Sequence, residues 1–164
     1  MRCTSKILED LIVENPNDKI LFEQYKLYVE MANDVSERRD RTNKFYATLM
    51  SLLLTIFGII NSINKEWIIF IIPLSIMILI SLVWMKNIQS YSTLNRGKFD
   101  VINEIEKELP AKGFTIEWEL MELYHYQELT KVEKNVPLII LLISTILTIS
   151  LIVAVFIQKG CCFF

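Results

Sequence analysis

The chain has 164 residues, of which 52% are hydrophobic, and its 17 basic and 19 acidic residues leave a formal net charge of -2. This hydrophobic share, with a mean hydropathy of +0.37, exceeds what a soluble domain of this length needs for its core. Because the charges nearly balance, nothing predicts a nucleic-acid partner. The three cysteines, Cys3, Cys161 and Cys162, lack the spacing of a zinc site or of a disulfide framework.

The first region, 1–44, is charged and predicted to be helical over its second half. Asn17 is a suitable N-cap, and apolar residues follow at helical spacing: Leu21, Tyr25, Tyr28, Ala32 and Val35. No glycine or proline interrupts the chain from there to Gly58. We therefore expect one long helix from about residue 17 to residue 63, which extends well into the cytoplasm before it enters the membrane.

Three stretches carry no Asp, Glu, Lys, Arg or His and are predicted to span a bilayer: 45–63, 68–85 and 136–157. A hydrocarbon core of about 30 Å needs roughly 20 such residues in a helix. Only residues 64–67 separate the first two spans, so these must form an antiparallel hairpin. Pro73 is expected to bend the second span, and Trp67 and Trp84 are expected in the aromatic belts at its two ends.

The basic residues indicate the orientation of the spans. Most lie before the first span, after the second and before the third: Arg38, Arg39, Arg41, Lys44, Lys86, Arg96, Lys98, Lys131 and Lys134. Only Lys65 and Lys159 lie on the other side. The positive-inside rule thus predicts a cytoplasmic N-terminus, a cytoplasmic region 86–135 and a short external C-terminus, 158–164.

The region 86–135 is predicted to consist of helical extensions of the membrane spans. The second helix should continue to Leu109, where Pro110 and Gly113 end it, and a further amphipathic helix should cover 117–135. Pro137 marks either a new helix start or a kink. The fold class is therefore all-α: a polytopic membrane protein with three transmembrane helices whose long helical extensions form an oligomeric bundle. A closed monomeric bundle is the alternative.

No residue pattern predicts catalysis, a metal or another cofactor. His125 is the only histidine, so it is expected to be an ordinary, partly buried helical residue. Glu117, Glu119 and Glu122 are expected to favour a helix N-terminus and to face water. An enzyme whose site forms between subunits around Glu117, Glu122 and His125 is the weakest of the hypotheses.

Hydroxyl groups are the main polar feature of the spans. Ser144 and Thr148 share one face of the third span, where they serve either helix packing or the lining of a narrow pore. Cys161 or Cys162 is a candidate for an intermolecular disulfide outside the cell.

A set of scattered positions resembles the RipA-type small integral membrane proteins of bacteria, a family described as octameric. The resemblance includes the stretch from Tyr25 to Arg39. Its other positions are Ser90, Tyr91, Leu94, Asn95, Lys98, Phe99, Val101, Ile102, Glu104, Glu106, Leu109, Pro110, Glu117, Trp118, Leu129, Thr130, Glu133, Val136 and Pro137. It implies a multi-pass inner-membrane protein that forms a homo-octamer, and it implies no biochemical activity.

Two main functions remain open. The first is a structural oligomer or scaffold of the bacterial inner membrane, whose partners are lipid, further copies of itself and an unidentified cytoplasmic protein. The second is a gated channel or a pore-forming effector of a bacterial defence system, since the spans are uncharged and carry hydroxyls. The third span departs from the two-span pattern of such effectors.

Overall fold

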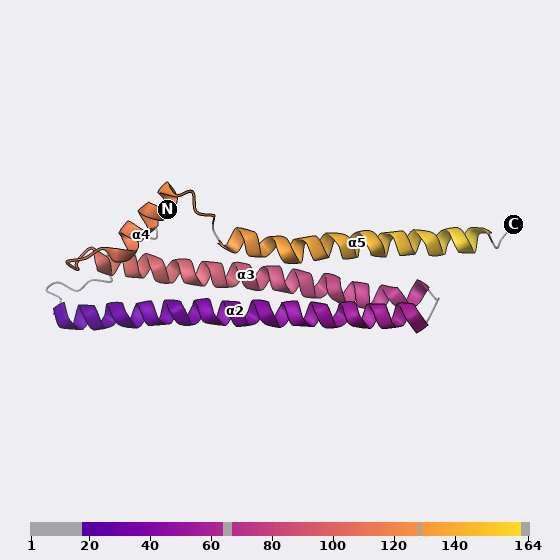
Figure 1. The fold of residues 1–164 in the computed structure, drawn as a ribbon, viewed down its shortest axis with the longest axis horizontal. Coiled ribbons are helices and arrows are strands. Elements are labelled where there is room, and N and C mark those ends of the chain that lie inside the picture. The colour runs from indigo at the N-terminus through magenta and orange to yellow at the C-terminus, as the bar shows by residue number, and fades with distance from the viewer. Residues whose placement is uncertain (1–17, 64–66, 128, 162–164) are drawn as a thin grey trace. The chain divides into compact units, whose positions relative to one another are not determined.

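In the computed structural model, which describes residues 18–63, 67–127 and 129–161, every regular element is a helix (Figure 1). Four are α-helices: α2, Asp18–Ile63; α3, Ile71–Glu106; α4, Gly113–Leu123; and α5, Leu129–Cys161. A short 3-10 helix, η1, covers Trp67–Phe70. The all-α prediction is confirmed, and α2 is the continuous helix that the absence of glycine and proline predicts.

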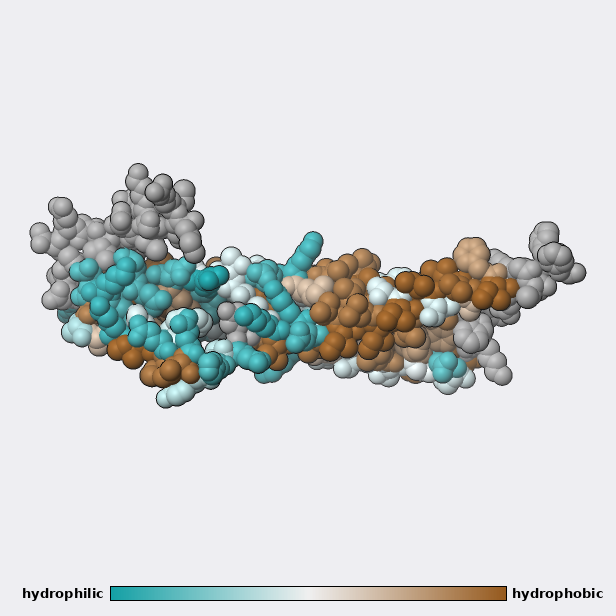
Figure 2. All heavy atoms as spheres, turned by 90° about the horizontal axis from the view of Figure 1, so that it is seen from above, coloured by the Kyte–Doolittle hydropathy of each residue, from teal (hydrophilic) through white to brown (hydrophobic). Residues whose placement is uncertain are grey.

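Three of these helices, α2, α3 and α5, are long and apolar enough to cross a membrane. The protein is thus a multi-pass membrane protein. The chain divides into two compact units. We call Met1–Arg39 with Ser90–Glu128 the extramembrane unit, and Asp40–Gln89 with Leu129–Phe164 the membrane unit. The membrane unit contains all three predicted spans, and hydrophobic surface gathers over it in Figure 2.

The core of the membrane unit forms where α2, α3 and α5 meet. Met50 of α2 packs with Met77, Trp84 and Ile88 of α3, and Ile140 of α5 packs against this cluster. Trp84 is buried within this unit: its ring stacks on Tyr46 at 5.6 Å, and its Nε1 donates to Asn43 Oδ1 at 2.9 Å. The side chain of Trp67 lies outside the described residues.

Two prolines are accommodated differently from the sequence expectation. Pro73 lies in the first turn of α3, directly after η1, where a missing N–H costs no intrahelical hydrogen bond. It therefore helps to start α3 rather than to bend it. Pro137 lies inside α5, which begins eight residues earlier at Leu129. The alternative in which Pro137 starts a new helix is therefore wrong. The Pro137 ring is fully buried.

The prediction of a single helix over 117–135 is wrong, because α4 ends within this range and α5 begins at Leu129. Helix α4 ends at Leu123, and a turn follows in which Tyr126 N–H donates to Met121 O at 3.0 Å and His125 N–H donates to Glu122 O at 3.1 Å. His125 has a φ of 54°, so the turn is a Schellman motif with histidine in the left-handed position. His125 is exposed rather than partly buried in a helix.

Helix α3 also ends earlier than predicted. Its last residue is Glu106 instead of Leu109, and backbone bonds from Lys107, Glu108 and Leu109 to the carbonyls of Glu104, Ile105 and Glu106 form the closing turn. Pro110 follows in the exposed connection to α4. This early end places the side chain of Glu106 beside the beginning of α4.

Candidate functional site

The most organised polar site among the described residues lies in the extramembrane unit, around the carboxylate of Glu106. This side chain is completely buried at the C-terminus of α3. A negative charge is normally unfavourable there, because the C-terminus of a helix carries the negative end of the helix dipole. Glu106 must therefore be stabilised by groups outside α3.

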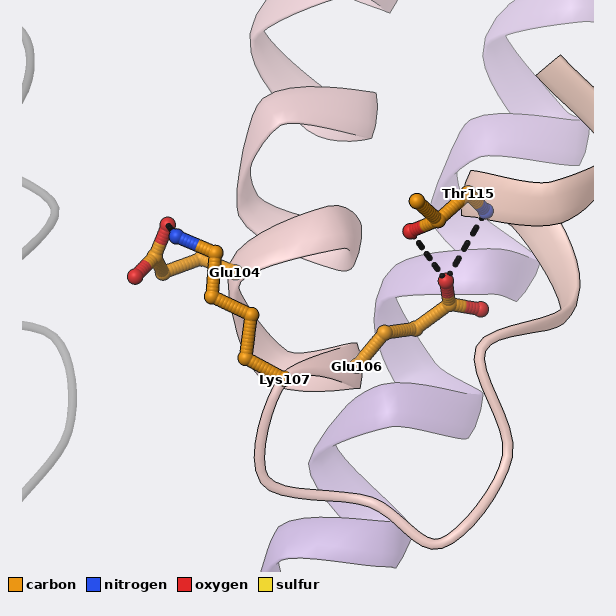
Figure 3. A network of polar contacts seen from close by, with 4 residues as sticks. All are labelled: Glu104, Glu106, Lys107 and Thr115. Atoms are coloured by element: carbon orange, nitrogen blue, oxygen red, sulfur yellow. Dashed lines mark hydrogen bonds and ion pairs between the residues drawn. The ribbon is translucent and has the colours of Figure 1, made fainter. Parts of the chain in front are cut away.

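The beginning of α4 supplies most of these groups. Phe114 N–H donates to Glu106 Oε1 at 2.9 Å, and Thr115 N–H donates to Oε2 at 3.0 Å. The Thr115 hydroxyl also donates to Oε2, at 2.9 Å (Figure 3). Lys112, the residue at the N-cap of α4, makes no side-chain capping bond. Glu106 thus caps α4 from a distance and places a negative charge at its positive end.

Helix α2 completes the site. Tyr25 donates its hydroxyl to Glu106 Oε1 at 2.8 Å, across 81 residues of sequence. The ring of Phe114 lies between two aromatic rings, with Tyr25 at 6.3 Å and Phe99 of α3 at 5.6 Å between centroids. One carboxylate and one aromatic cluster therefore join α2, α3 and α4 of this unit.

The hydrogen bonds determine the protonation state of Glu106. Burial by itself raises the pKa of this carboxyl, but the bonds from Phe114, Thr115 and Tyr25 outweigh burial and hold the pKa below its ordinary 4.5. The pKa of Tyr25 is raised from 10.0 to about 12, mainly by burial. The hydrogen bond to Glu106 and the negative charge of Glu106 raise it further. At neutral pH the site thus contains a carboxylate and a neutral phenol.

The structure brings three positions of the family resemblance, which we call motif residues, into this site: Tyr25, Phe99 and Glu106. Glu104 points elsewhere and pairs with Lys107 at 2.7 Å (Figure 3). Several other motif residues are half-buried in their helices: Tyr91, Asn95, Lys98, Thr130 and Glu133. Leu94, Pro110, Glu117 and Trp118 are exposed, and the Trp118 Nε1 donates to Glu122 at 3.1 Å.

Sequence reasoning missed Phe114 and Thr115, because the predicted helix began only at residue 117, whereas α4 begins at Gly113. A signal was present in the two acidic residues Glu104 and Glu106, which are unexpected in the last turn of a helix. The N-terminus of α4 is Gly113 with no acidic residue in its first turn, so Glu117 does not serve the helix start as predicted.

The hydroxyls singled out in the third span lie in the membrane unit. Ser144 is 1% exposed, and Thr148 donates its hydroxyl to the Ser144 carbonyl at 2.7 Å. Cys3 and Cys162 lie outside the described residues, as does the side chain of Cys161. Among the described residues, no group of three or more His, Cys, Asp or Glu side chains is arranged to hold a metal ion.

Comparisons with known proteins agree with this architecture. The model of the octameric membrane protein family (8xMP) matches residues 22–153, a range that contains all of α3 and α4 and most of α2 and α5. Searches of curated proteins and of solved structures returned no match. The match carries the octameric description without the RipA-type name, and it covers most of the 164 residues. The chain belongs to the octameric membrane protein family.

Proposed function

We propose that the protein is a non-catalytic scaffold of the bacterial inner membrane, in which the extramembrane units of neighbouring copies pack together and present a joint surface to a cytoplasmic partner. Apolar side chains exposed on the extramembrane unit support this proposal. On α2 these include Ile20, Leu27 and Met31, which are 59%, 54% and 40% exposed. They follow one another at positions typical of one helix face and lie beside the face that holds the buried Leu21, Ala32 and Val35.

Helix α4 adds to this surface. None of its residues is buried, and its exposed large side chains are Ile116, Trp118, Leu120 and Leu123. Hydrophobic patches interrupt the hydrophilic surface of this unit in Figure 2. Outside the bilayer, each Å² of apolar surface left in water forgoes about 25 cal/mol of burial free energy. A family that assembles into octamers supplies the covering partner in the form of further copies.

Two alternatives have less support. For a channel, Ser144 and Thr148 would line the pore, but the burial of Ser144 favours a role in helix packing. Ion flux through liposomes, measured with both residues replaced by leucine, tests that alternative. For an enzyme, Glu117, Glu122 and His125 are all exposed, and Trp118 donates to Glu122. We assign these three residues no reaction.

The scaffold proposal is tested by measuring the mass of the full chain extracted in mild detergent. We expect an oligomer for the unchanged protein and a smaller species for Leu27→Glu, because the substitution places a charge in the proposed contact. Asn33→Glu is the matched control, since it adds the same charge at an exposed polar position of α2 and should leave the mass unchanged. A monomer for the unchanged chain, or equal effects of both variants, would contradict the proposal.

A further inference from the structure

A row of small residues runs along the face of α2 that points away from the rest of the membrane unit, between the exposed large side chains of Leu52 and Ile59 on one side and Leu54 on the other. The small residues are Thr48, Ser51, Thr55, Gly58 and Ser62, all exposed and separated alternately by three and four positions. Tyr46, Met50, Leu53 and Phe57 repeat with the same spacing and pack within the unit. Because successive residues turn by about 100°, Thr48, Ser51 and Thr55 lie almost opposite Met50, Leu53 and Phe57. We call the five small residues the α2 groove.

Among the described residues, none covers the five positions of the α2 groove, which are all exposed. A Cβ atom added at Gly58 would meet no atom within 4 Å. The hydroxyls are satisfied within α2: Thr48, Ser51, Thr55 and Ser62 donate to the carbonyls of Lys44, Ala47, Ser51 and Ile59 at 2.7–3.0 Å. The groove therefore combines little side-chain bulk with few unsatisfied polar groups. In lipid, such surfaces are typical of close helix contacts, because they let two backbones approach.

Helix α5 carries the complementary shape. Its outward face has large residues at the same alternating spacing: Ile139, Leu142, Ile146, Ile149, Val153 and Phe156, all at least 50% exposed. We call them the α5 ridge. Five of the six ridge residues come two positions before a buried or half-buried one, as Leu142 does before Ser144 and Ile146 before Thr148. The ridge thus also points away from the interior of its own unit.

Ring closure explains why one copy needs both surfaces. A ring of more than two identical subunits uses head-to-tail contacts, in which one surface of a copy meets a different surface of the next. Of the three spans, α3 is the most covered, with 33% of its apolar window buried against 6% for both α2 and α5. The two outward surfaces therefore lie on the two helices that have the most unburied surface.

We propose that the α2 groove of one copy receives the α5 ridge of the next copy inside the membrane. This inference rests on the proposed homo-oligomer and assigns its contact within the bilayer. Ridges that enter grooves are the general way in which helices pack, and small groove residues allow the axes to come close. Each copy then presents a groove on one side and a ridge on the other, and repeated contacts close the ring.

Paired cysteines in the full chain test this contact in native membranes. Thr55 and Ile146 lie near the middle of their spans, so Thr55→Cys with Ile146→Cys should form disulfides between copies, with Cys3, Cys161 and Cys162 replaced by serine. A disulfide requires Cα atoms within about 7 Å. The expected result is a ladder of linked species on a denaturing gel. Ile56→Cys with Leu147→Cys is the control at the same depth, on other faces of both helices, and should remain monomeric on that gel.

Two further measurements separate the possible outcomes. If the oligomer mass is unchanged but neither pair gives a ladder, or both pairs give equal ladders, the groove contact is overturned and the scaffold proposal stands. A monomeric mass would overturn both proposals. Thr55→Cys alone should resist a water-soluble maleimide. Labelling there would show that the groove faces water as a pore lining does, and would overturn the contact in favour of a channel.

Bulk added to the groove provides a second test with a variant that keeps the fold. Gly58→Leu places a good helix former where an added Cβ meets no other described part of the chain within 4 Å, so the protomer should stay intact. The side chain would occupy the space proposed for the ridge, and the oligomer should be lost. Ile56→Phe adds bulk on another face of α2 and should leave the oligomer mass unchanged. An unchanged mass for Gly58→Leu would contradict the contact.

Discussion

The Glu106 carboxylate holds three structural elements together through a few donors, and its removal should be costly. Glu106→Ala leaves the N–H groups of Phe114 and Thr115 and the Tyr25 hydroxyl without their acceptor. Because an unsatisfied buried donor costs roughly 1–3 kcal/mol, we expect a destabilisation of about 3 kcal/mol. Glu106→Gln keeps an acceptor oxygen and should cost about half as much.

Amide hydrogen exchange can locate this effect. In Glu106→Ala, the amides of Phe114 and Thr115 should exchange faster, while the amides of the membrane unit should keep their protection. Glu108→Ala removes an exposed carboxylate two positions away and serves as the control. Unchanged protection at Phe114 and Thr115 in Glu106→Ala would show that Glu106 does not cap α4.

The same residue predicts a dependence of stability on pH. Since the pKa of Glu106 is lowered in the folded protein, its contribution is complete above the ordinary value of 4.5 and is lost as the pH falls through the lowered value. The pKa of Tyr25 is raised, so its contribution is complete below 10.0 and is lost as the pH rises through about 12. Between pH 4.5 and pH 10.0, neither group should change its protonation on unfolding, so this pair should not make the melting temperature depend on pH.

Glu106→Gln is the variant that tests the acid side of this profile. Its amide does not titrate, so the difference in melting temperature between the unchanged protein and the variant should shrink as the pH falls below 4.5. A difference that stays constant through the acid range would rule out Glu106 as the titrating group.

At the scale of elements, the C-terminus of α4 contains a conformation that its residue does not favour. His125 has a φ of 54°, which costs an L-residue about 1 kcal/mol relative to glycine. His125→Gly should therefore raise the free energy of unfolding by about 1 kcal/mol, and His125→Val should lower it by at least as much. Thermal denaturation of both variants checks the two signs. A glycine variant less stable than the unchanged protein would contradict the account.

Helix interiors were predictable here and helix ends were not. The run without glycine or proline predicts α2 almost to the residue, because nothing in it breaks the hydrogen-bond ladder. The end of α4 was missed because the Schellman motif, which usually contains glycine, contains His125 instead. The end of α3 was missed because Glu106 is drawn to donors of α4 that follow it in sequence.

For the whole molecule, the distribution of basic residues predicts the sidedness of the chain. We expect a tag at the N-terminus to be protected from a protease outside the cell and a tag at the C-terminus to be cleaved, since three spans place the two ends on opposite sides. Digestion of intact cells, compared with digestion of permeabilised cells as the control, measures this. Equal protection of both tags would contradict an odd number of crossings.

The sequence by itself determined the all-helical class, the three membrane spans and the membership in an octameric family. The helical class and the spans follow from the local composition of the chain, because uncharged stretches of this length prefer hydrocarbon to water wherever the rest of the chain lies. The family membership follows from residues spread along the sequence from 22 to 153. Only the tertiary structure decided which residues meet. Tyr25 lies 81 residues before Glu106, and Thr115 lies nine residues after it on another helix. A buried carboxylate selects such partners by the donors that the fold brings within hydrogen-bond distance. The α2 groove and the α5 ridge became distinct surfaces for the same reason, since packing inside the protomer determines which helix faces remain uncovered.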